Sequence, residues 1–109
     1  MDGPVNLLEL AAGREAGPFN RVFLAGADQR ARPTLTISPG LWHHHPNSPE
    51  TFLVLEGLPV LEFRNASAVT LVPDMAFTVP AGVSHRSSSV RAVSVNPEVE
   101  DQQVVLEGE

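Results

Sequence analysis

A chain of 109 residues with a net charge of −6 and no cysteine excludes several classes of protein. The length suits one domain with one hydrophobic core, and the 42% of apolar residues are spread along the chain, which argues against wholesale disorder. Seven Lys and Arg against 13 Asp and Glu leave no basic stripe for a phosphate backbone, so we expect no nucleic-acid partner. Without cysteine, any metal must be held by nitrogen and oxygen ligands.

The sequence also lacks the patterns that direct a chain to a membrane or out of the cell. No apolar run approaches the ~18 residues that a membrane-spanning helix needs. The first residues do not show a basic segment followed by an apolar core, which is the pattern of a secretory signal peptide. We therefore expect a cytoplasmic protein that does not bind a membrane.

The distribution of 10 Pro and 8 Gly is typical of an all-β domain. Apolar stretches of about five residues end at turn residues, and no helix-length stretch shows a 3.6-residue period. We expect one domain over residues 1–109, with residues 1–20 as a possible N-terminal arm. Within that arm Asn6–Ala12 can form a helical turn, with Asn6 as its cap and Glu9 as the partner of the cap.

The expected strands follow one another at short intervals. One shows clean alternation, with Leu61 and Phe63 on one face and charged residues on the other. Thr51–Leu55 is apolar on both faces, which indicates that its outer side is covered. About nine or ten short strands in one small domain must avoid exposed edges, which predicts a closed barrel or a double-sheet jelly roll. The expected strands are Arg21–Leu24, Thr34–Ser38, Leu41–His45, Thr51–Leu55, Leu61–Arg64, Ala68–Val72, Met75–Val79, His85–Ser89, Arg91–Val95 and Gln103–Leu106.

Three of the four histidines stand in a row at 43–45, and a carboxylate, Glu50, follows shortly after them. Neutral imidazole and carboxylate are the side chains that hold a divalent metal without sulfur. On a strand, His43 and His45 share one face while His44 points away. If Pro46–Pro49 reverses the chain, Glu50 lies across from His45 in an antiparallel hairpin.

The fourth histidine, His85, follows a tight turn at Pro80–Gly82 and opens a later strand. In a barrel this residue can complete the set from the facing sheet. The alternative interpretation is that the histidines are surface or hydrogen-bonded residues and that Glu50 is a solvated turn residue. From the chemistry of the residues alone, the two interpretations have equal standing.

Two spaced motifs favour the metal site. The stretch His43-x-His45-x4-Glu50-x6-Gly57 resembles the first motif of the cupin family, and Asp74-x5-Pro80-x-Gly82-x2-His85 resembles the second. Both occur in the family's order and at an ordinary separation, and together they cover residues 40–89.

Three positions depart from the cupin pattern. Ile37 and Asp74 stand where the family has glycine, and Ser89 stands where it has asparagine. These positions shape turns and do not bind metal, so the departures affect local geometry. Asp74 is the mildest of them, because aspartate tolerates a positive φ better than most residues.

The resemblance implies a cupin double-stranded β-helix barrel that holds one divalent ion (Fe, Mn, Zn, Ni or Cu) through four side chains. Four ligands on an octahedral ion leave two positions for water, O2 or a bidentate substrate. The resemblance further implies metal-dependent chemistry on a small organic molecule, as in cupin dioxygenases, isomerases and decarboxylases. The alternative is a non-catalytic module that binds or senses a small ligand, since a short chain leaves few loops for a lid. The implied ligands are His43, His45, Glu50 and His85.

Other residues are assigned to the barrel interior or to its outer surface. Trp42 is expected to pack on the outside, and Arg86 and Arg91 are more readily solvated strand residues than an anion site. Cupins commonly dimerise, so we expect a homodimer. For each interior residue, core packing is favoured over a role in a pocket. The expected substrate pocket contains Phe52, Val54, Phe63, Phe77 and Ser87.

Overall fold

The computed structural model describes residue 8 and residues 19–20, 24–25, 29–37, 39–99 and 101–108. Residue 8 is helical, and the rest of the expected helical turn at 6–12 and most of the N-terminal arm lie outside these residues. The described residues form an all-β structure, as predicted. Its strands are β1 Phe19–Asn20, β2 Leu24–Ala25, β3 Gln29–Thr36, β4 His43–His44, β5 Glu50–Glu56, β6 Val60–Phe63, β7 Val69–Thr70, β8 Ala76–Val79, β9 His85–Ser88, β10 Ala92–Val99 and β11 Val105–Leu106.

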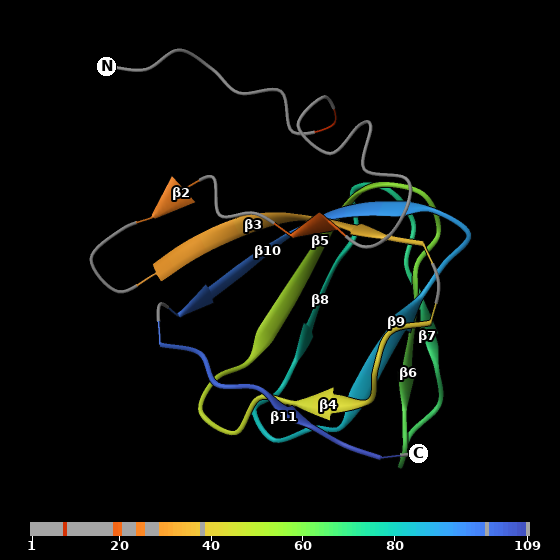
Figure 1. The fold of residues 1–109 in the computed structure, drawn as a ribbon. Helices are drawn as coiled ribbons and strands as arrows, with labels where there is room; N and C mark the ends of the chain where they lie inside the picture. The colour runs from red at the N-terminus through yellow and green to blue at the C-terminus, as the bar shows by residue number, and fades with distance from the viewer. Residues whose placement is uncertain are drawn as a thin grey trace.

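The strands form two antiparallel sheets that face each other as the walls of one barrel (Figure 1). The first sheet has the order β1-β3-β10-β5-β8, with β2 also paired to β3, and the second has the order β11-β4-β9-β6-β7. From β3 onward the chain crosses from one sheet to the other at almost every connection, apart from the β6–β7 hairpin. This alternation is the jelly-roll arrangement that buries sheet edges in a small all-β domain.

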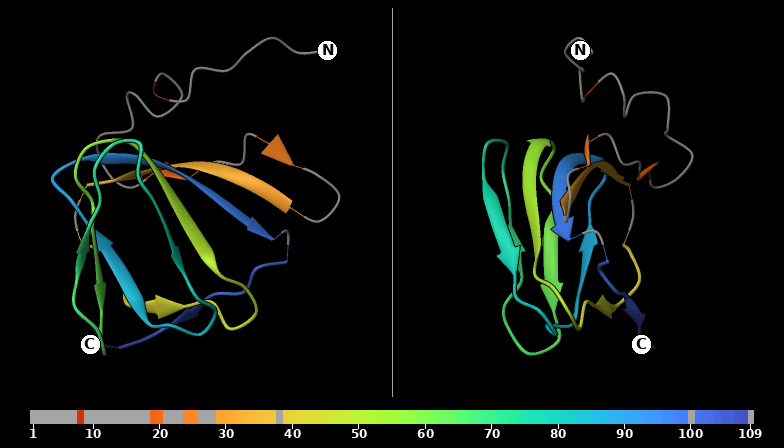
Figure 2. Two further views of the ribbon diagram at one scale, coloured as in Figure 1. Left: turned by 180° about the vertical axis from the view of Figure 1, so that it is seen from behind. Right: turned by 90° about the vertical axis from the view of Figure 1, so that its left-hand side faces the viewer.

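Strands β4 and β11 are paired at one end of the barrel. Both views of Figure 2 place them together at the bottom, away from β2 at the top. The expected edge strand at Gln103–Leu106 therefore exists as the shorter β11. Among the described residues, no helix has the length and apolar character needed to cross a membrane.

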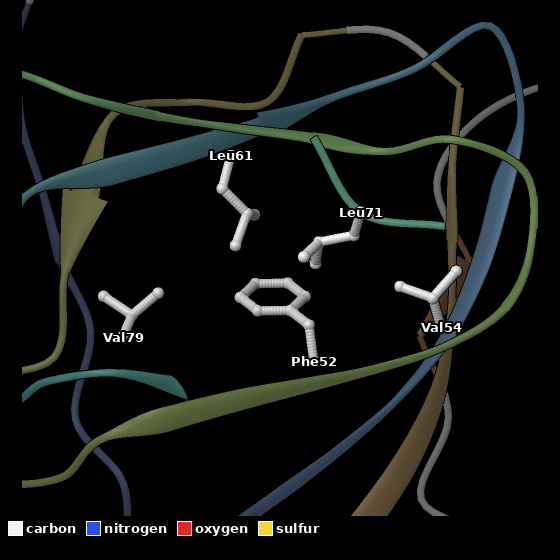
Figure 3. Packing of buried hydrophobic residues seen from close by; sticks show 5 residues of the cluster. All are labelled: Phe52, Val54, Leu61, Leu71 and Val79. Carbon is white, nitrogen blue, oxygen red and sulfur yellow. The ribbon is translucent and has the colours of Figure 1, made fainter. Parts of the chain in front are cut away.

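The hydrophobic core lies between the two sheets. Its buried side chains come from both walls and from the loop after β7, and Figure 3 shows them converging around the ring of Phe52. Leu61 is fully buried. Phe63 and Phe77 are partly buried and pack against these core residues. The cluster consists of Phe52, Val54, Leu61, Leu71 and Val79.

Two turn residues hold backbone conformations that L-residues rarely adopt. Gly57 has φ 86°, and a Cβ there would lie 2.3 Å from the carbonyl oxygen of Arg91, so only glycine fits. Asp74 has φ 74°, a conformation that aspartate tolerates better than most residues, and it stands where the resembled motif has glycine.

Strand β10 runs further than the sequence pattern predicted. The expected strand ended at Val95, whereas the observed one continues to Val99 through Pro97. Proline cannot donate a ladder hydrogen bond. It is tolerated here because the pairing of β10 with β5 ends at Val95, so that β3 alone accompanies the last residues.

Candidate metal centre

The four side chains singled out by the sequence motifs meet in the interior of the barrel. One ligand atom from each of His43, His45, Glu50 and His85 lies within 4.8 Å of those of the other three. His45 and His85 are buried, with 7% and 1% of their surface exposed, and the other two are partly buried. Imidazole nitrogen and carboxylate oxygen are the donors that bind first-row divalent metals. The cluster can therefore hold one metal ion.

The route by which these residues meet differs from the predicted hairpin. His43 on β4 is paired directly with His85 on β9, so these two come from the same sheet. Glu50 opens β5 and comes from the facing sheet. The hairpin prediction was wrong because Pro46–Pro49 carries the chain across the barrel, and its two prolines lack the N–H groups that a ladder would use.

A main-chain hydrogen bond connects the two motifs. The N–H of Gly82, in the turn before β9, donates to the carbonyl of His45 at 2.8 Å. The turn at Pro80–Gly82 is thereby held against the end of β4, and β9 starts three residues later with His85. The second motif thus places its histidine beside the first motif through backbone geometry.

Each histidine of the cluster is oriented by a main-chain carbonyl. The Nδ1 atoms of His43, His45 and His85 each lie 2.8 Å from a carbonyl oxygen, contributed by Leu41, Gln103 and Val83 respectively. A carbonyl only accepts hydrogen bonds, so Nδ1 must carry the proton in all three rings. In the neutral rings Nε2 then holds the lone pair, and it points toward the centre of the cluster.

The three Nε2 atoms surround one oxygen of Glu50. Oε1 lies 2.9 Å from Nε2 of His85, 3.2 Å from that of His45 and 3.9 Å from that of His43. Because Nδ1 already carries a proton, an Nε2 can donate to Oε1 only in a doubly protonated ring. Neutral rings would point lone pairs at a carboxylate, so the cluster needs either protons or a metal ion at its centre.

The close approach of the rings to Glu50 also shifts the pKa values of residues in the cluster. Burial alone would raise the pKa of Glu50, but the nearby ring of His43 and the hydrogen bonds with His45 and His85 hold that pKa well below its usual range. The nearby carboxylate of Glu50 raises the pKa of His43. Burial opposes a similar shift at His45, but Glu50 and the Gln103 carbonyl raise the pKa of that ring as well.

A cavity of about 380 Å³ opens beside the cluster, near the lower end of the range of small-molecule sites. His43, His45 and Glu50 form part of its wall, and His85 is not among the described residues that line it. Of the expected pocket residues, Phe52 and Ser87 line this cavity. Val54 lies in the core, and Phe63 and Phe77 pack against the core. The other lining residues are Thr34, Asn96, Glu98, Gln102 and Val104.

Sequence reasoning missed the contribution of β10 to this wall. Asn96 and Glu98 follow Ser94 at every second position, which is the pattern of one strand face. Asn96 donates from Nδ2 to Glu50 Oε2 at 3.3 Å. The alternation could have been found in the sequence if the strand had been extended past Pro97.

His44 and Trp42 face away from the cluster, as expected. Nδ1 of His44 lies 2.7 Å from Glu107 Oε2. The guanidinium groups of Arg64 and Arg86 lie over the Trp42 ring at 4.3 and 4.8 Å from its centroid. Such cation–π contacts belong to outer packing and not to the cavity.

The two arginines considered as an anion site are both paired with carboxylates. Arg86 donates to Glu62 at 2.8 Å, and Arg91 donates to Glu56 at 2.7 Å. Neither of them is among the described residues that line the cavity.

Comparisons with solved structures show the same architecture. A cupin-2 domain protein from Shewanella frigidimarina is 22% identical, with a TM-score of 0.80, and the match covers 88% of this chain and 94% of that one. A conserved protein with a double-stranded β-helix domain from Klebsiella pneumoniae is 15% identical, with a TM-score of 0.83 and full coverage of both chains. The DMSP lyase DddQ from Ruegeria pomeroyi is 17% identical, with a TM-score of 0.74 over 85% of this chain and 54% of that one.

Comparisons of sequence place the chain in a family. The uncharacterized protein YdbB of Bacillus subtilis is 36% identical over 66 residues, which are 60% of this chain and 58% of that protein. The chain therefore matches little more than half the length of this relative. The model of the cupin domain family matches residues 34–94, a range that includes all four residues of the cluster. The chain belongs to the cupin domain family.

Proposed function

We propose that the protein binds one divalent metal ion through His43, His45, Glu50 and His85, and that it binds and transforms a small oxygen-bearing organic molecule in the adjacent cavity. One observation carries the proposal. Three imidazoles with the same protonation at Nδ1 direct Nε2 at one carboxylate oxygen in the wall of the cavity. A divalent cation satisfies all four donors at once, whereas the metal-free cluster depends on extra protons.

A bound metal would supply Lewis-acid activation of a substrate oxygen. The chain's own residues would bind and orient that substrate. Phe52 and Val104 provide apolar surface that excludes water, while Thr34, Ser87 and Gln102 offer hydroxyl and amide groups. The same fold carries a DMSP lyase, so it accommodates enzymatic chemistry, but at 17% identity that likeness supports no particular substrate.

Metal analysis tests the metal site. Natively purified wild-type protein should carry close to one metal ion per chain after reconstitution, and Glu50→Ala and His85→Ala should carry far less. Two matched controls should keep the wild-type content. Glu56→Ala removes a carboxylate that lies on the same strand as Glu50 and pairs with Arg91. Glu62→Ala removes a carboxylate on β6 that pairs with Arg86.

The outcomes are distinct. Equal and negligible metal in the wild type and in both ligand variants would refute the metal site. If the loaded protein binds small ligands but converts none of them, the function is binding or sensing. Turnover that disappears in Glu50→Ala and persists in Glu56→Ala would establish an enzyme.

A further inference from the structure

Two polar side chains are buried side by side on β10 next to the metal cluster. Ser94 is 4% exposed and Asn96 is 3% exposed, and their spacing puts both on the inward face of the strand. Val93 and Val95 alternate with them, and Val93 packs with Leu35 on the other face. Buried hydroxyl and amide groups cost free energy unless they are hydrogen-bonded, so the contacts of this pair define what it does.

The hydrogen bonds of the pair run in one direction. The carboxylate of Glu50 only accepts hydrogen bonds, so the amide nitrogen of Asn96 must face it, and Nδ2 lies 3.3 Å from Oε2. Oδ1 of Asn96 then faces the other way and accepts from the hydroxyl of Ser94 at 2.7 Å. Ser94 thus holds the amide in the orientation that lets it donate to Glu50.

This chain of contacts divides the two oxygens of Glu50 between different partners. Oε1 is surrounded by the three histidines, and Oε2 receives the amide of Asn96. The terminal torsion of a glutamate is broad, so the histidines alone would leave the plane of the carboxylate poorly defined. A donor on Oε2 restricts that rotation and keeps Oε2 away from the centre of the cluster.

We infer that Asn96, held by Ser94, is a positioning residue that presents Glu50 to the metal through Oε1 alone. This inference rests on the proposed metal site and adds to it. A carboxylate that binds through one oxygen occupies one coordination position, whereas a carboxylate that binds through both occupies two. With a metal bound, Asn96, which also lines the cavity, would thereby leave a coordination position available to the substrate.

The test uses full-length protein and Co²⁺ as the probe. Asn96→Leu removes the donor at similar size, and Ser94→Ala removes the contact that orients it. Thr34→Val is the matched control, because Thr34 also lines the cavity and is paired with Ser94 across β3 and β10. Two quantities are measured without substrate: the affinity for Co²⁺, by competition with a chelator, and the visible absorption spectrum of the Co²⁺ complex, which reports the number and arrangement of its ligands.

We expect Asn96→Leu to lower Co²⁺ affinity by about 10- to 100-fold, the usual effect of losing a partner of a metal ligand. Its Co²⁺ spectrum should shift in position and intensity. Ser94→Ala should change both quantities in the same direction by less, and Thr34→Val should leave both at the wild-type values. A residue that only supports the fold would lower the melting temperature and leave the Co²⁺ spectrum unchanged.

The inference is overturned if folded Asn96→Leu binds Co²⁺ with wild-type affinity and spectrum. That result would make Asn96 a substrate contact or a packing residue. If Asn96→Leu does not fold, Ser94→Ala decides the question, because unchanged affinity and spectrum in that variant also overturn the inference. Failure of the wild type to bind any of Co²⁺, Fe²⁺, Mn²⁺, Zn²⁺, Ni²⁺ and Cu²⁺ would instead refute the metal site itself.

Discussion

The protons on three imidazoles decide what the cluster can bind. Main-chain carbonyls of Leu41, Gln103 and Val83 keep a proton on each Nδ1, which leaves every Nε2 to compete for a proton or a metal. In the metal-free protein the carboxylate of Glu50 favours the proton, since it raises the pKa of His43 and of His45. Metal and protons are therefore alternative occupants of one site.

This competition predicts that the stability of the protein without metal and its affinity for metal change in opposite directions as the pH rises. The raised pKa values of His43 and His45 add folding stability that is fully present below pH 6.5, the ordinary pKa of histidine. This stability is lost as the pH rises through the raised pKa values. The lowered pKa of Glu50 adds folding stability that is fully present above pH 4.5, the ordinary pKa of glutamate. This stability is lost as the pH falls through the lowered pKa.

The EDTA-treated protein should therefore have a larger free energy of unfolding at about pH 6 than at about pH 8 in urea titrations. Glu50→Gln should remove most of that difference. The affinity for Zn²⁺ should rise over the same interval, because the ligands must lose their protons to bind metal. Metal-free stability that increases from about pH 6 to about pH 8 in the wild type would contradict this account.

At the scale of elements, the segment Asp101–Gly108, here called the strap, ties one end of the barrel together. Its β11 pairs with β4, and the carbonyl of Gln103 orients His45. Glu107 receives hydrogen bonds from Ser84 and Arg64 and lies 2.7 Å from His44. Contact with His44 is the main reason that the pKa of Glu107 is lowered.

We expect Glu107→Ala to loosen the strap and, through Gln103, the metal site. The three side chains of β11 and its preceding residue are exposed, so hydrogen bonds and ion pairs hold this strand more than apolar burial does. Amide hydrogen exchange in residues 103–106 should accelerate, and Co²⁺ affinity should fall by up to about 10-fold. Glu56→Ala, which removes a surface ion pair elsewhere, should change neither. Faster exchange with unchanged affinity would show that the strap does not support His45.

The packing of the two sheets predicts how far truncating a core side chain lowers the free energy of unfolding. Leu61 on β6 is fully buried among residues of both walls, beside Phe52. Leu61→Ala should lower the free energy of unfolding by about 2–5 kcal/mol, from lost burial and the cavity that remains. Leu58→Ala is the control, because Leu58 is 58% exposed and its truncation should cost little. Equal effects of the two substitutions in urea titrations would contradict the observed packing.

At the scale of the whole molecule, metal binding should stabilise the barrel because its ligands come from both sheets. At a free metal concentration about 100 times Kd, binding adds about 2.7 kcal/mol. A change of about 1 kcal/mol shifts the Tm of a domain of this size by about 4–8 °C, so EDTA should lower Tm by roughly 10–20 °C. Glu50→Ala should show no such shift. An EDTA effect of the same size in wild type and Glu50→Ala would have a cause other than this site.

The homodimer expected from the sequence stays a prediction. On the outer face of the first sheet, Leu53 is 38% exposed and is paired with Ala76 across β5 and β8. If copies associate through this face, light scattering at micromolar concentration should give twice the chain mass, and Leu53→Glu should give the monomer mass. A wild-type protein that is monomeric under the same conditions would remove the prediction.

The sequence by itself determined the fold class and the identity of the four clustered residues. Alternation and turn residues encode which faces of short strands are apolar, and that pattern is enough for an all-β barrel. Motif spacing singled out His43, His45, Glu50 and His85, which the fold brings together. It also singled out Asp74 as a turn residue, and Asp74 indeed has a positive φ.

The tertiary structure alone decided how those residues meet and what supports them. The two-residue period of a strand assigns each side chain to a face but does not say which strand lies next to that strand. The sequence pattern therefore places Glu50 in a hairpin with His45, whereas Glu50 reaches the cluster from the opposite wall. The carbonyl of Gln103 and the amide of Asn96 act over 58 and 46 residues of chain. Local patterns carry no information about such contacts, because they exist only once the barrel has closed.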